Sequence, residues 1–142
     1  MGIKSSDILA MGFSAAMYAI DEAALIDQIG AAIAEQEKIV VARVGQAVFD
    51  RAENAMAAAQ AVKFFTASEM ARRRIVHLSA NIRTDSAEGA EAKHLEKMIA
   101  YWDARAEIWI AKMADGGIED SGGFATGCTV SASDSRRAIS EI

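Results

Sequence analysis

Apolar residues recur at helical spacing through most of this chain, and no proline interrupts the pattern. The pattern is clearest between residues 92 and 113, where the spacing alternates between three and four residues. The positions of this seam are Ala92, Leu95, Ile99, Trp102, Ala106, Trp109 and Met113. Such alternation is typical of a helix that packs along another helix. Because helical spacing also recurs upstream, the sequence predicts an all-α fold, a small bundle of about four helices.

Two helices are predicted in the first half of the chain. The first begins with Ser5 or Ser6 as its N-cap. Its inward face is expected to contain Leu9, Phe13, Met17 and Ile20. The second pattern covers residues 21–62, and its apolar register shifts near residues 35–38, which predicts a break or bend there. Gly45 is expected to be tolerated inside this pattern, since one glycine weakens a helix without ending it.

Two more helices are predicted in the second half. The segment Thr66–Glu69 has the spacing of a capping box, so the third helix is expected to begin there and to end around residues 81–84. Its inward residues are expected to be Met70, Ile75, Val76 and Leu78. The fourth helix carries the seam. It is predicted to begin after Asp85 or Ser86 and to stop at Gly116.

The fourth helix is long for a chain of this size. It would extend about 43 Å at 1.5 Å per residue. We therefore expect part of the seam, including Trp102 and Trp109, to contact another chain. The alternative is that both tryptophans are core anchors of the bundle itself.

The composition changes at Asp115, where a segment rich in Gly, Ser and Thr begins and continues to the last residue. We expect residues 1–115 to form the helical domain and residues 116–142 to form an extended docking arm. Residues 124–132 have β-compatible side chains that could add a strand to the edge of a partner's sheet. Candidate partner-binding residues in the arm are Phe124, Cys128, Val130, Ile139 and Ile142. The alternative is a terminus that docks nowhere.

Charge and composition exclude several classes of partner. The formal net charge of −5 argues against a nucleic-acid-binding surface. The run Arg72–Arg74 fans around a helix, so it suits a solvated face or ion pairs between subunits better than a phosphate-tracking stripe. The most apolar stretch, residues 8–20, is too short to cross a bilayer, so we expect no membrane contact. A single cysteine, Cys128, excludes an internal disulfide.

Few groups in the sequence suit catalysis or metal binding. The two histidines, His77 and His94, lack the neighbouring groups that a nucleophilic mechanism requires. Glu91 and His94 have the Glu-x-x-His spacing of di-iron bundles, but such a site needs a second motif, and Arg74 stands three residues before His77. One cysteine and no paired histidines also fall short of a zinc site. We therefore expect no enzyme activity and no cofactor or metal.

Residues 21–35 have the sequence DEAALIDQIGAAIAE and are followed by VARVG at residues 41–45. This segment resembles the opening helix of the head-tail adaptor (head-completion) proteins of tailed bacteriophages. Residues 57–74, AAAQAVKFFTASEMARRR, resemble the second, alanine-rich helix of that family, which ends in arginines. We take the resemblance to cover about half of the chain.

The resemblance implies a structural virion protein that is made in the cytoplasm of the bacterial host and is placed in the neck of the particle. Such proteins form a ring of twelve copies that docks on the portal protein. The ring extends the channel through which DNA passes without sequence-specific binding, and it offers a platform to the stopper or tail-terminator protein. The alternative is a cytosolic helical-bundle interaction protein or regulator that acts as a dimer.

Overall fold

The computed structural model describes residues 2–79 and 87–120, and describes residues 114–120 by their backbone alone. Within these residues the chain forms five α-helices and two short 3₁₀ helices, and no strand, which confirms the all-α fold. The elements are α1 (Ser5–Leu9), η1 (Ala15–Tyr18), α2 (Glu22–Val44), α3 (Gln46–Phe49), η2 (Ala52–Asn54), α4 (Ala55–Ser79) and α5 (Ala87–Asp120).

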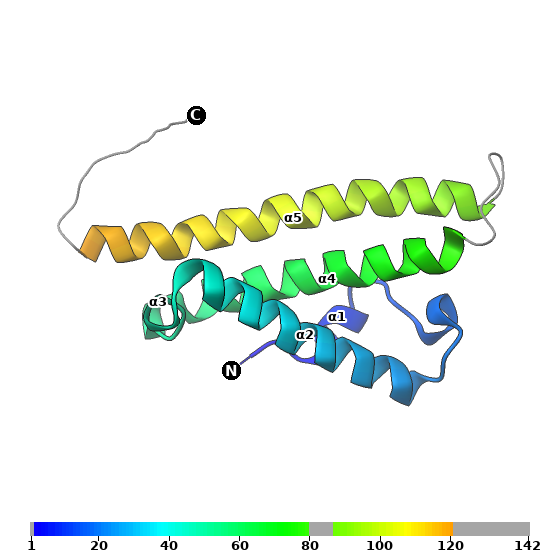
Figure 1. The fold of residues 1–142 in the computed structure, drawn as a ribbon, viewed down its shortest axis with the longest axis horizontal. Coiled ribbons are helices and arrows are strands. Elements are labelled where there is room, and N and C mark those ends of the chain that lie inside the picture. The colour runs from blue at the N-terminus through cyan, green and yellow to red at the C-terminus, as the bar shows by residue number, and fades with distance from the viewer. Residues whose placement is uncertain (1, 80–86, 121–142) are drawn as a thin grey trace.

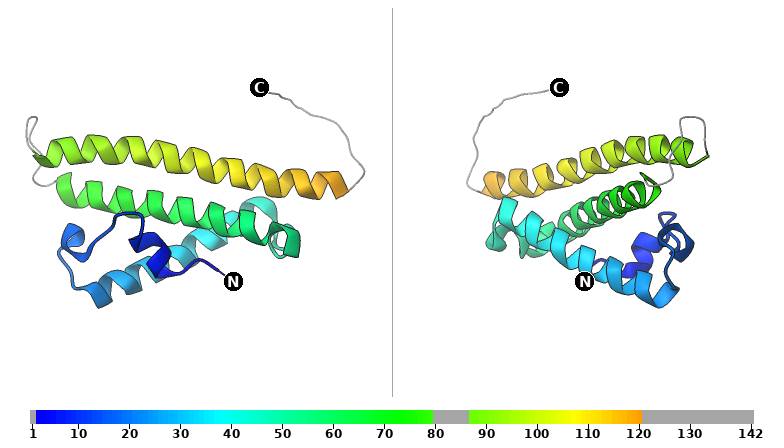
Figure 2. Two further views of the ribbon diagram at one scale, coloured as in Figure 1. Left: turned by 180° about the vertical axis from the view of Figure 1, so that it is seen from behind. Right: turned by 45° about the vertical axis from the view of Figure 1, so that its right-hand side comes forward.

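The helices are stacked in three layers, with α4 in the middle (Figure 1). On one side α5 runs antiparallel to α4 along its whole length, and α5 forms an outer layer of the molecule (Figure 2). On the other side α2 crosses α4, and the N-terminal segment with α1 and η1 lies beside α2. The two ends of α4 therefore have different neighbours: α3 lies near its first turn and η1 near its last.

The predicted seam of α5 packs on α4. Its members are buried or partly buried, and all of them except Ala106 belong to one of two core clusters. The larger cluster joins the N-terminal segment, α2, α4 and the first half of α5 around Ile8, Leu25 and Met70. The smaller cluster joins the other ends of α2, α4 and α5 around Val40 and Met113. The chain's own helices thus cover the seam, as the core-anchor interpretation of the tryptophans expects.

The single N-terminal helix expected up to Ile20 is wrong, although its inward residues are placed correctly. The helix α1 ends at Leu9, and the chain turns at Gly12, whose φ of 111° excludes a continued helix. The N-cap is Lys4 rather than a serine, and its backbone N–H donates to the carboxylate of Asp7 over 2.8 Å. Phe13 is buried, and the other expected inward residues pack against the larger cluster: Leu9, Met17 and Ile20.

The break expected within residues 35–38 is also wrong, because α2 continues through these residues without interruption. Gln36 is buried although it is polar. A polar residue thus occupies one inward position of α2, and for this reason the apolar pattern alone suggested a change of register. The chain breaks at Gly45 instead, where φ is 93° and ψ is 146°. An L-residue with a side chain rarely adopts this conformation, and Gly45 therefore ends α2 and begins α3.

The predicted start of a helix at Thr66 is wrong, since Thr66 lies within α4, which begins at Ala55. The Thr66 hydroxyl is fully buried and donates to the carbonyl of Val62, one turn earlier, over 2.7 Å. A capping-box spacing can occur inside a helix when alanines upstream keep helix propensity high. Met70 and Leu78 are buried as expected, whereas Val76 is 71 % exposed.

The predicted stop of the last helix at Gly116 is wrong as well, because α5 continues to Asp120. A glycine costs a helix about 1 kcal/mol relative to alanine, which is too little to terminate a long helix by itself. The first five residues assigned to the docking arm are therefore helical. Its remaining residues, 121–142, lie outside the described part of the chain, together with the strand and the partner contacts predicted there.

Candidate functional site

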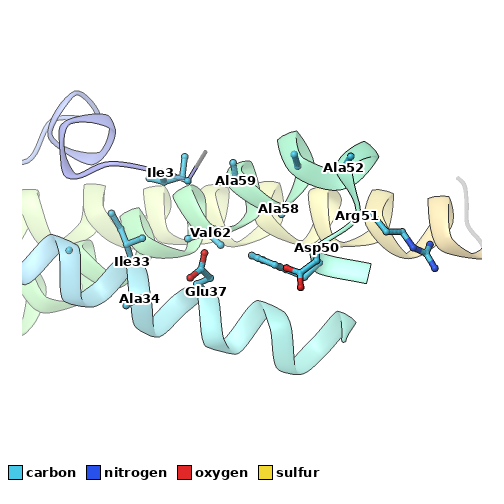
Figure 3. A pocket seen from close by; sticks show the side chains of 14 residues that line it. Ile3, Ile33, Ala34, Glu37, Asp50, Arg51, Ala52, Ala58, Ala59 and Val62 are labelled. Carbon is cyan, nitrogen blue, oxygen red and sulfur yellow. The ribbon is translucent and has the colours of Figure 1, made fainter. Parts of the chain in front are cut away.

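A hollow of about 480 Å³ lies between α2, α4 and the turn formed by α3 and η2 (Figure 3). The N-terminal residues Gly2 and Ile3 close one side of it. Its lining mixes polar and apolar groups, and the apolar side chains include Ile3, Ile33, Phe49, Ala58, Ala59 and Val62. We call this site the α2–α4 groove. A concave, partly apolar surface of this kind is the usual form of a binding site for a side chain or a short segment.

The groove arises from the turn after α2. Gly45 redirects the chain so that α3 folds back across the end of α2, which places Phe49 against the smaller core cluster. Asn54 is 5 % exposed and its side-chain amide donates to the carbonyl of Val48 over 2.8 Å, which fixes the turn before α4. The first turns of α4 then present Ala55, Ala58 and Ala59, whose small side chains leave the hollow unfilled.

Two carboxylates mark the groove. Glu37 comes from α2 and Asp50 from the end of α3, and both line the hollow (Figure 3). A second hollow of about 410 Å³ shares Glu37, Phe49 and Asp50 with the first, so the concave surface continues over α3. Asp50 accepts a hydrogen bond from the Gln46 amide over 2.8 Å. The Arg51 side chain extends away from both carboxylates in Figure 3. The groove therefore suits an apolar segment that carries a positive charge.

A second polar cluster surrounds Arg74 and holds η1 on the helices. The guanidinium donates to both carboxylate oxygens of Glu91 on α5, over 2.8 and 3.1 Å, and also to the backbone carbonyl of Met17. Beside it, the buried Tyr18 hydroxyl donates to the Met70 carbonyl over 2.7 Å. The hydrogen bonds that Arg74 donates to Glu91 lower the pKa of Glu91 and raise the pKa of Arg74. These hydrogen bonds connect η1, α4 and α5, so the cluster is structural in character.

The Glu-x-x-His pair is not a metal site in this arrangement. Glu91 is engaged by Arg74, and His94 is exposed on the solvent side of α5. In the part of the chain that the structure describes, no group of three His, Cys, Asp or Glu side chains could hold a metal ion. His77 is exposed near the end of α4.

The arginine run forms ion pairs within the chain. Arg72 reaches Asp103 on α5 over 2.5 Å, and Arg73 lies 3.0 Å from Glu69 and 3.6 Å from Glu35. These pairs are partly exposed, so each contributes at most about 1 kcal/mol. The sequence predicted either a solvated face or ion pairs between subunits for these arginines. The structure instead pairs all three side chains with carboxylates of the same chain.

The two tryptophans predicted to contact a partner differ in their surroundings. Trp102 is 6 % exposed, and its ring centroid lies 5.9 Å from that of Phe13. Trp109 is partly buried against the smaller cluster, with the Lys112 ammonium 4.4 Å from its ring centroid. Partner contact by either residue stays a prediction. The other predicted contacts lie outside the described residues: Phe124, Cys128, Val130, Ile139 and Ile142.

Sequence reasoning missed the α2–α4 groove. Its two carboxylates, Glu37 and Asp50, looked like ordinary surface charges, and the groove depends on the turn at Gly45, which was expected to be helical. The available signal was the succession of Gly45, Asp50 and Asn54, because glycine, aspartate and asparagine together favour turns over helix.

No family model, curated protein or solved structure matches this chain. Among the described helices, none is both long enough and apolar enough to cross a membrane. The function is therefore inferred from the residues of this chain and their arrangement.

Proposed function

We propose that this chain is a structural subunit of the neck of a tailed bacteriophage. In this role it is a head-tail adaptor that docks on the portal ring, extends the DNA channel and links the capsid to the stopper or tail. Copies of the chain form the ring, and the function depends on assembly rather than on catalysis.

The observation that best supports this proposal is the position of the two segments that resemble the adaptor family. Residues 22–44 form α2 and residues 55–79 form α4, and these two helices pack on each other. The N-terminal segment lies beside α2, and α5 covers the other side of α4 (Figure 1). The resembling segments thus form two adjacent layers of the three-layered fold.

The charge distribution is also compatible with a channel that does not bind DNA tightly. The formal net charge of the chain is −5, and the three consecutive arginines are paired with carboxylates of the same chain. A wall with these properties repels phosphates or leaves them free to slide, since tight binding to DNA requires clustered, available cations.

The proposal is tested by imaging the protein in its native particle and counting copies around the axis. Twelve copies in a ring against the portal support the adaptor function. A free dimer that is absent from any particle contradicts it and favours the cytosolic interaction protein. The contribution of the arm is tested with a chain that ends at Asp120. We expect this truncated chain to keep its helical circular dichroism signal and to lose assembly with the portal.

A further inference from the structure

The outer face of α5 carries a second stripe of regularly spaced residues, distinct from the buried seam. The stripe, called here the α5 ridge, consists of Lys97, Tyr101, Ala104, Ile108 and Ala111. Its spacing alternates between four and three residues, so these positions share one face of the helix. All five are exposed, and the two large ones, Tyr101 and Ile108, are 54 % and 47 % exposed. An apolar ridge on an outer helix is typical of a contact surface.

The ridge and the α2–α4 groove lie on opposite sides of the molecule. The seam of α5 faces α4, so the ridge faces away from the bundle. The groove is formed by the N-terminal segment, α2, α3, η2 and α4, on the side of α4 that is turned from α5 (Figures 1 and 3). One copy therefore presents a convex apolar surface on one side and a concave, partly apolar surface on the other.

The charges on the two surfaces are complementary. Lys97 lies in the ridge and Lys112 lies at its edge. The groove is lined by Glu37, Asp50 and Arg51, and the Arg51 side chain extends away from the two carboxylates (Figure 3). An apolar contact flanked by opposite charges gains specificity from those charges, while its apolar centre supplies most of the affinity.

Packing of one ridge on another ridge is less favourable. A parallel pair would bring Lys97 against Lys97 of the second copy, because equivalent positions meet across a parallel helix pair. An antiparallel pair would bring the flank that carries Glu96 against the same flank of the other copy, whereas Glu107 on that flank is paired with Arg43 of its own chain over 2.6 and 2.7 Å. The parallel arrangement thus places Lys97 against Lys97, and the antiparallel one places Glu96 on the flanks that meet.

We propose that the α5 ridge of one copy docks in the α2–α4 groove of the next copy. The contact is heterologous, since it joins two different surfaces. After the first contact the pair of copies keeps one free ridge and one free groove, so further copies can add. The assembly closes into a ring where the rotation between neighbouring copies permits closure, and otherwise extends as a filament. This inference rests on the proposed ring-forming function and supplies the contact between its subunits.

The test uses two charge-reversed forms of the full chain. The ridge variant carries Lys97→Glu and Ile108→Glu, and the groove variant carries Glu37→Lys and Asp50→Lys. All four positions are exposed, so we expect unchanged helical circular dichroism. Sedimentation velocity over a range of concentrations measures association of each variant and of the wild type. Val76→Glu is the matched control, because Val76 is 71 % exposed and belongs to neither surface.

We expect the wild type and the control to form species larger than dimers, and each variant alone to associate at least about tenfold more weakly. An equimolar mixture of the two variants is expected to recover association and to form at least a heterodimer, since it holds one intact ridge and one intact groove, and the two reversed surfaces also carry opposite charges. A wild type that stays monomeric or stops at a dimer overturns the inference. A mixture that forms no heterodimer also overturns it.

Portal binding separates this inference from the proposed function. A purified portal ring is incubated with the wild type and with the ridge variant. Binding of the portal by a ridge variant that no longer self-associates supports both proposals. A wild type that forms rings through this contact but does not bind the portal contradicts the adaptor function and leaves the ridge–groove contact standing.

Discussion

At the scale of single residues, Tyr18 fixes the N-terminal segment to the middle of α4. It is 9 % exposed, and burial raises the pKa of its hydroxyl well above the usual range, so the hydroxyl is always a donor to the Met70 carbonyl. We expect Tyr18→Phe to lower the free energy of unfolding by about 1 kcal/mol, the value of one buried hydrogen bond. Urea unfolding measures this change. Tyr101→Phe is the control and should change nothing, since Tyr101 is 54 % exposed.

Glu91 makes the stability of the fold dependent on pH. Its hydrogen bonds from Arg74 lower its pKa below the usual 4.5. A carboxylate with a lowered pKa in the folded state stabilises the fold at pH values above its unfolded pKa, and this stabilisation is lost as the pH falls through the lowered value.

We expect Glu91→Gln to be about 1–2 kcal/mol less stable than the wild type at pH 7, because a charge-assisted pair becomes a weaker one. The difference should shrink as the pH falls through the lowered pKa of Glu91, since the wild-type carboxylate then becomes protonated. Urea unfolding at pH 7 and at progressively lower pH measures the difference. An unchanged difference at low pH would contradict the role of the charge. Glu96→Gln, at an exposed position of α5, is the control.

At the scale of elements, two glycines of the same helix region have opposite roles. Gly30 lies inside α2, where an added Cβ would meet the Ser5 hydroxyl oxygen at an ordinary 3.9 Å. Gly45 ends α2 with a φ of 93°, and no neighbour lies within 4 Å of an added Cβ. Space is therefore available at both positions, and only the backbone conformation distinguishes them.

We expect Gly30→Ala to stabilise the protein by about 0.5–1 kcal/mol, because alanine favours a helix interior over glycine. Gly45→Ala should destabilise it by about 1–3 kcal/mol, because alanine is strained at this φ. Thermal unfolding of the two variants measures both effects. A Gly45→Ala variant as stable as the wild type would mean that α2 and α3 can join into one helix.

At the scale of the whole molecule, Trp102 joins parts of the chain that are far apart in sequence. It lies in the larger core cluster with Phe13 from the N-terminal segment, Met70 from α4 and Leu25 from α2. Trp109, one heptad later, is partly buried at the smaller cluster, and its indole N–H is buried and has no hydrogen-bond partner among the described residues. Removal of Trp102 therefore affects the larger core cluster, whereas removal of Trp109 affects the smaller one.

We expect Trp102→Ala to lower the free energy of unfolding by about 3–5 kcal/mol through the cavity that it leaves. Trp109→Phe should cost less than about 1 kcal/mol, since it also removes an unpaired buried donor. Urea unfolding followed by far-ultraviolet circular dichroism compares the variants. Equal losses in both would contradict the assignment of Trp102 as the anchor of the larger cluster.

The sequence by itself determined the fold class and most of the core. Helical spacing without proline requires helices, and the α5 seam and the inward residues Leu25, Ile29 and Met70 follow directly from apolar periodicity, because burial of apolar surface selects one face of each helix. This pattern is local, and it can be read without knowledge of the neighbouring helices.

Only the tertiary structure decided where the helices end and which surfaces remain open. Gln36 is buried although it is polar, and Thr66 lies inside a helix, where its hydroxyl donates to the carbonyl of Val62 rather than capping an N-terminus. The α2–α4 groove needs the turn at Gly45 and the alanines of α4 to meet in space. Glycine, threonine and glutamine each fit several local conformations, and the choice among them depends on packing between distant segments.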